Sequence, residues 1–230
     1  MLKGKRRKNM KKKIFLLSLL FFTSLFTIGC QLCDCGLLLP NNPSPTPEEH
    51  FTFDENTRTI TGYYNGTGWN PHGDDIVIPP TINNLPVEHI GYKAFKSDFD
   101  TWIRSVVFPD TITTIGSYAF FADCLHSLTI PDSVKSIGSY AFCNNYLTSV
   151  TIPGSVDFID EQVFGGNPLR SITIGADVNI YNGYSIGYKG PATFPTLVPK
   201  YVEFKSFYDA NGREAGTYIF TDSDTWIKAE

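Results

Sequence analysis

The chain has 230 residues, 19 of them basic and 23 acidic, so its formal net charge at pH 7 is −4. Hydrophobic residues make up 42% and charged residues 18% of the chain, which suits one globular domain of ordinary size. The acidic balance excludes a general electrostatic affinity for nucleic acid.

The first 29 residues have the composition of an export signal. Residues 3–13 contain eight Lys or Arg and no acidic residue, and residues 14–28 are almost wholly apolar. This run is shorter than the about 20 residues that a membrane-spanning helix needs, although an uncleaved anchor helix is the alternative. Removal of residues 1–29 would leave 11 basic and 23 acidic residues, a net charge of about −12.

The stretch Phe26-Thr27-Ile28-Gly29-Cys30 resembles the lipobox of a bacterial lipoprotein signal peptide, which places a small residue directly before the cysteine to be acylated. Thr27 departs from this pattern, because leucine is usual there. The resemblance implies that residues 1–29 are removed and that lipidated Cys30 holds the exported protein on a membrane. Residues 40–49 contain four prolines, so 30–50 is predicted to form a lipidated N-terminus and a stiff tether, with simple disorder as the alternative.

A folded domain is predicted at 51–230. Its first part, 51–75, includes FTFDENTRTITGYY, which is typical of two strands around a polar turn. A repeat region needs such a terminal segment, because an uncovered end exposes apolar surface and unpaired backbone. We therefore expect 51–75 to be an N-terminal cap.

Three stretches, 106–127, 128–149 and 150–171, fall into register at a spacing of 22 residues. Self-similarity at this period predicts a solenoid in which each unit is one coil and neighbouring coils supply each other's core. Seven positions are apolar in all three units, and we expect them to form the buried stack. In the middle unit these positions are Leu128, Ile130, Val134, Ile137, Ala141, Phe142 and Leu147.

Three further features of the repeat predict its local structure. Each unit opens with an alternating segment that stops at a proline, which predicts one short parallel strand per coil. The column of Gly116, Gly138, Asp160 and Asn182 predicts a left-handed corner, because these residue types tolerate positive φ. A second column predicts a structural ladder of Asx side chains bonded to the backbone, at Asp123, Asn145 and Asn167.

The repeats weaken in both directions. Residues 76–95 match the template with an insertion, a few more residues are added near 96–102, and 181–200 keeps only traces, so the repeats are predicted to span 76–200. Residues 201–230 are expected to form a C-terminal cap. Asn211-Gly212 predicts a hairpin there and Trp226-Ile227 one more strand. Cys124 and Cys143 occupy different columns, which favours buried free thiols over a disulfide.

The stretches SVKSIGSYAF (133–142) and LTSVTIPGSVDFI (147–159) resemble the BspA-like leucine-rich repeat family, and the likeness extends over roughly 51–230. The third unit departs from the pattern at Asp160 and Val163. The resemblance implies a right-handed leucine-rich-repeat superhelix with hairpin-like caps. It also implies a cell-surface protein that binds host or neighbouring-cell proteins, without enzymatic activity or a cofactor.

Strand residues that flank the inward pair should point outward and form a hydroxyl-rich surface, here called the candidate face. The bland alternative is that Ser and Thr simply suit a solvated sheet and that the two inserted aromatics pack locally. The candidate face comprises two strand columns, a bordering column and the inserted aromatics: Ser105, Ser127, Ser149, Ser171; Val107, Thr129, Thr151, Thr173; Arg104, His126, Thr148, Arg170; Phe99 and Trp102.

Two other classes of function are alternatives to protein binding. A carbohydrate-active solenoid enzyme would need clustered acids, whereas those here are scattered through turns, and the four histidines lack metal-ligand spacing. A passive structural component of the cell envelope fits the same repeats. The family resemblance implies protein binding or adhesion instead, and deletion of residues 51–230 would separate binding from the structural role through loss of adhesion or of envelope integrity.

Overall fold

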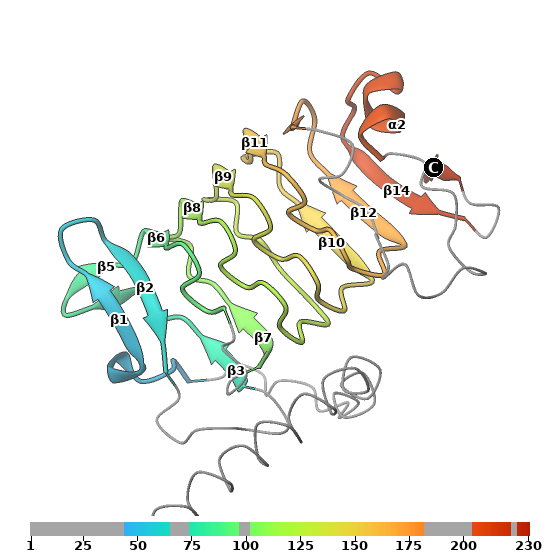
Figure 1. Ribbon diagram of the computed structural model, residues 1–230. Helices are drawn as coiled ribbons and strands as arrows, with labels where there is room; N and C mark the ends of the chain where they lie inside the picture. Colours follow the sequence, from blue (N-terminus) through green and yellow to red (C-terminus); the bar gives the residue numbers. More distant parts are fainter. Residues whose placement is uncertain (1–43, 65–73, 97–101, 182–203, 222–224) are drawn as a thin grey trace, which may run out of the picture. The chain divides into compact units, whose positions relative to one another are not determined.

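The computed structural model describes residues 44–64, 74–96, 102–181, 204–221 and 225–230. Two series of short strands run through the repeats (Figure 1). The first series is a seven-stranded sheet: β1 (Phe51–Asp54), β2 (Thr59–Tyr63), β6 (His89–Ile90), β8 (Thr114–Ile115), β9 (Ser136–Ile137), β11 (Phe158–Ile159) and β13 (Asn179–Ile180). The second series contains β3 (Asp74–Val77) with β7 (Ile103–Val107), and β10 (Ser149–Ile152), β12 (Ser171–Ile174), β14 (Gly216–Phe220) and β15 (Trp226–Lys228).

In the regular units, both series follow the 22-residue period. In the seven-stranded sheet, Thr114 pairs with Ser136 and Ser136 with Phe158, all in parallel. In the second series, β10 pairs in parallel with β12, and Thr129 forms a single parallel bridge to Thr151. The predicted strand before each proline is therefore present, although the 128–149 coil keeps only the bridge. The two-residue strands of the first series were not predicted.

The predicted core is confirmed at every one of its positions. All seven apolar columns are buried in each of the three regular units, with the aromatic column wholly buried. The rings of Phe120 and Phe142 are stacked with centroids 5.4 Å apart, and those of Phe142 and Phe164 lie 5.7 Å apart, each pair within 6° of parallel. Phe95 continues the stack on Phe120 at 4.6 Å. Burial of one such side chain contributes roughly 1.5–3 kcal/mol, which only stacked neighbours can supply.

The left-handed corner lies two residues beyond its predicted place. Gly116, Gly138 and Asp160 do not have positive φ, whereas Tyr118 and Tyr140 do, at 60° and 61°. The glycines are needed for a different reason: a Cβ on Gly138 would lie 2.7 Å from the Ser117 nitrogen of the previous coil. Asn182 lies outside the described residues. The two tyrosine rings stack at 4.8 Å, so the strained backbone brings aromatic surface together at this corner.

The Asx ladder is confirmed. Asn145 is buried, its Oδ1 accepts the Leu125 N–H at 3.0 Å, and its Nδ2 donates to the carbonyl oxygens of Phe120 and Phe142 at 2.8 and 3.1 Å. Asn167 repeats this arrangement one coil later, with the Leu147 N–H as donor. Each amide therefore joins its own coil to the preceding one.

The N-terminal cap contains the predicted pair of strands, because β1 and β2 are antiparallel. Residues upstream of it also contact the domain. The Thr46 N–H donates to the Val77 carbonyl, and Thr46 Oγ1 accepts the Val77 N–H, each at 2.9 Å. A short 3-10 helix, η1 (Glu48–His50), follows, and a small hairpin is formed by β4 (Thr81–Ile82) and β5 (Leu85–Pro86).

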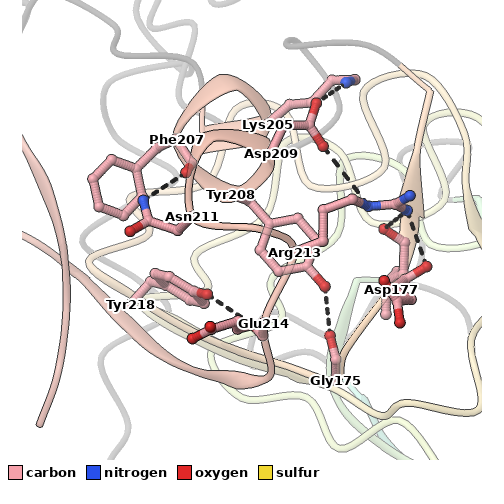
Figure 2. Close-up of polar contacts among 11 residues, drawn as sticks. Gly175, Asp177, Lys205, Phe207, Tyr208, Asp209, Asn211, Arg213, Glu214 and Tyr218 are labelled. Atoms are coloured by element: carbon pink, nitrogen blue, oxygen red, sulfur yellow. Dashed lines mark hydrogen bonds and ion pairs between the residues drawn. The ribbon is translucent and has the colours of Figure 1, made fainter.

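The C-terminal cap differs from its prediction at one point. Asn211-Gly212 does not join two strands but follows the helix α2 (Phe204–Ala210), and Gly212 has a φ of 69°. The cap hairpin is instead formed by β14 and β15. Figure 2 shows how the helix is tied to the last coil: Tyr208 donates to the Gly175 carbonyl at 2.6 Å, and Arg213 Nη2 donates to the Asp177 carbonyl at 2.9 Å.

Cys124 and Cys143 are both buried and free, as predicted. Burial raises the pKa of the Cys143 thiol to about 11. The predicted signal, Cys30 and most of the tether lie outside the described residues. No helix of the described ranges is long and apolar enough to cross a membrane.

Candidate functional site

The strand residues of the candidate face lie in register in neighbouring coils. Pairing of β10 with β12 places Ser149 beside Ser171 and Thr151 beside Thr173. The middle of the face is exposed, whereas its two ends are half-buried and Phe99 lies outside the described residues. The exposed members are Val107, His126, Ser127, Thr129, Thr148, Ser149, Thr151 and Arg170, and the half-buried ones are Trp102, Arg104, Ser105, Ser171 and Thr173.

The N-terminal end of the face carries a charged cluster. β3 pairs in parallel with β7, which brings Asp75 opposite Ser105. Ser105 Oγ donates to Asp75 Oδ1 at 2.6 Å, and Arg104 forms an ion pair with the same carboxylate. Burial raises the pKa of Asp75, but the hydrogen bonds from Arg104 and Ser105 outweigh it, so the pKa lies below its ordinary value. These contacts fasten the Arg104 and Ser105 side chains to β3 at this end of the face.

The C-terminal end of the face is apolar and was not predicted. β14 adds antiparallel to β12, with Ile219 opposite Ser171, and β15 adds Ile227 opposite Ile219. These two isoleucines are 39% and 47% exposed, in contrast to the buried apolar residues of the repeats. Thr217 continues the hydroxyl column, since its Oγ1 lies 2.9 Å from that of Thr173. The alternation within 216–220, with Tyr218 buried, was the signal in the sequence, but the partner strand of this segment could not be read from it.

One border of the face holds an aromatic pair. The rings of His126 and Tyr146 stack at 5.4 Å, and His126 Nδ1 donates to the Cys124 carbonyl at 2.8 Å. The repeat pattern predicted His126 on this border but not Tyr146. The pair presents a flat, partly polar surface beside the serines and threonines, of the kind that interfaces use.

Among the described residues, no group of three or more His, Cys, Asp or Glu could hold a metal ion. The face itself offers hydroxyl groups, a preformed ion pair and small apolar areas. Such groups can form hydrogen bonds and exclude water from a contact.

The family follows from the repeat itself. A family model described as a BspA type leucine-rich repeat region matches residues 77–191 in six copies, which is half of the chain. The chain belongs to this family. The BspA-type repeats thus account for the strands of both series that lie within 77–191, and they confirm the leucine-rich repeat fold that the 22-residue motif predicted.

Three solved structures resemble this BspA-type protein. A leucine rich repeat protein of T. pallidum is 23% identical over 56% of this chain and 71% of its own, with a TM-score of 0.43. A leucine rich cell surface protein of Faecalibacterium prausnitzii A2-165 is 26% identical over 64% of this chain and 47% of its own, at 0.44. A leucine-rich repeat protein of Bacteroides ovatus ATCC 8483 is 20% identical over 62% and 43%, at 0.34. No curated protein matches the chain.

Proposed function

We propose that this BspA-type protein is displayed on the cell surface and binds a protein partner through the candidate face, extended onto the C-terminal cap. The observation that carries the proposal is a column of paired hydroxyl residues that runs from the repeats onto the cap: Thr129, Thr151, Thr173 and Thr217. Two exposed isoleucines lie beside its C-terminal end, and the N-terminal strand of the face, β7, carries the ion pair of Arg104 with Asp75. Apolar area surrounded by polar groups is the usual composition of a protein interface.

The experiment compares charged substitutions on two surfaces of the same repeats. Thr129→Arg and Thr151→Arg change the candidate face, whereas Ser136→Arg changes the seven-stranded sheet in the same coil as Thr129. We expect the first two to weaken binding to purified host extracellular-matrix proteins by at least about tenfold, because they insert unpaired charges into a desolvated contact. The Ser136 variant should bind like the unaltered protein. Equal losses in all three, or no binding by any, would contradict the proposal.

We also propose that the protein is anchored by lipid on Cys30, which the lipobox resemblance supports. More than one acyl chain gives durable membrane binding, at roughly 0.8 kcal/mol per buried methylene. Mass spectrometry of the N-terminal peptide from membranes should show acylated Cys30 and no residues 1–29. Cys30→Ser should leave the signal uncleaved and unacylated, while Cys33→Ser should be processed normally. An unmodified Cys30 in the membrane-derived protein would refute the anchor.

A further inference from the structure

We propose that Asp123 is a neutral carboxylic acid in the folded protein, donating a hydrogen bond within the Asx ladder, and that loss of its proton loosens the start of β7. The first observation is its place in the ladder. Asp123 Oδ1 accepts the Ile103 N–H at 3.2 Å, as Asn145 Oδ1 accepts that of Leu125 at 3.0 Å. The side chain is 2% exposed, as deeply buried as the two asparagines.

The second observation concerns the other carboxyl oxygen of Asp123, Oδ2. In Asn145 and Asn167 the equivalent atom is an NH2 group that donates to two carbonyl oxygens, one in its own coil and one in the coil before. At Asp123 the atom is Oδ2, which is buried and has no hydrogen-bond partner. By the register of the repeat, Phe95 and Phe120 are the residues whose carbonyls correspond to those that Asn145 bonds. An ionised carboxylate can only accept, so a proton on Oδ2 is needed to bond to either one.

The surroundings favour that proton. Burial raises the pKa of Asp123 well above its ordinary value, and the Ile103 N–H lowers it by less. From the coil side, the titratable groups near it are the thiols of Cys124 and Cys143, both buried. From the β7 side the neighbouring charge is Arg104, which is bonded to Asp75. Among the described residues, no charged side chain therefore offsets the burial of an ionised Asp123.

The consequence is a stability that depends on pH in an unusual direction. Because the folded state binds this proton more tightly than the unfolded state, its contribution is complete below the ordinary pKa of an aspartic acid. It is lost as the pH rises through the folded-state pKa. The loss acts first on Ile103, the first residue of β7, and so on the end of the candidate face that holds Arg104 and Ser105. A slightly acidic environment would then favour the ordered face.

The test is urea unfolding of the full chain in mild detergent between about pH 4 and 8. Relative to Asp123→Asn, the unaltered protein should lose stability with rising pH, its unfolding constant growing up to about tenfold per pH unit. Asn145→Asp, the matched control, should acquire a second dependence of the same sign. Infrared spectra should show a protonated carboxyl band that Asp123→Asn lacks.

Two results would overturn the proposal. Identical pH profiles for the unaltered protein and Asp123→Asn would show that no proton is bound on folding. A stability of the unaltered protein that rises with pH relative to Asp123→Asn would show a carboxylate that is ionised in the folded state. Amide exchange at Ile103, corrected for its intrinsic pH dependence, separates a local loosening of β7 from global unfolding.

Discussion

Buried amide side chains form hydrogen bonds between neighbouring coils, in addition to the apolar contacts of the core. Asn167 bonds to the Leu147 N–H and to two phenylalanine carbonyls, and it is completely buried. These groups face one another where the chain turns and no strand pairing is available. One side chain thus satisfies three backbone groups that would otherwise be buried unpaired.

Asn167→Ala should therefore destabilise the protein more than an ordinary surface change. Each buried hydrogen-bonding group that is left unpaired costs about 1–3 kcal/mol. The mutation leaves several such backbone groups unpaired, and local relaxation of the chain lets water bond to some of them. Thermal and urea unfolding would measure the loss, with exposed Asn179→Ala as the control. A loss no larger than that of the control would mean that the ladder does not hold the coils.

For the helices and strands, the sequence predictions agree with the structure where the 22-residue period is strict, and they differ from it where the period ends. The repeat spacing predicted the buried columns, the strands before the prolines and the hydroxyl columns of the candidate face, because each depends on position within a coil. It did not predict the strands β8, β9 and β11, since two alternating residues carry no distinct signal. Asn211-Gly212 predicted a hairpin, yet the same residues also suit the end of a helix, and packing of Tyr208 against the last coil decided between them.

The extension of the candidate face onto the C-terminal cap could not be predicted from the sequence, for a similar reason. β14 pairs with β12 across a long sequence separation, and no repeat position marks the two as neighbours. Ile219 is outward because Tyr218 and Trp226 occupy the interior. Only the three-dimensional pairing reveals that two apolar residues continue a column of serines and threonines.

For the whole domain, the aromatic stack makes the coils depend on one another. Phe142 lies between Phe120 and Phe164, with both rings nearly parallel to it. Each regular coil by itself lacks a covering layer for its apolar residues, so the array is expected to unfold as linked units. A substitution in the middle of the stack should then weaken the coils on both sides of it.

Phe142→Ala should lower the free energy of unfolding by about 3–5 kcal/mol, because it opens a cavity in the centre of the stack. Phe142→Leu, which refills most of the volume, should cost considerably less. Urea unfolding followed by circular dichroism would compare the two. Similar losses for both variants would show that ring stacking, and not volume, is the dominant contribution.

The contact of Thr46 with Val77 has a mechanical consequence for a tethered molecule. Tension applied through the chain upstream of residue 44 enters the domain at this point, where two hydrogen bonds of 2.9 Å hold the strand edge. If these two bonds open first under tension, the chain lengthens by a few residues while the phenylalanine column stays intact. That lengthening would reduce the force passed from the proposed Cys30 anchor to the candidate face.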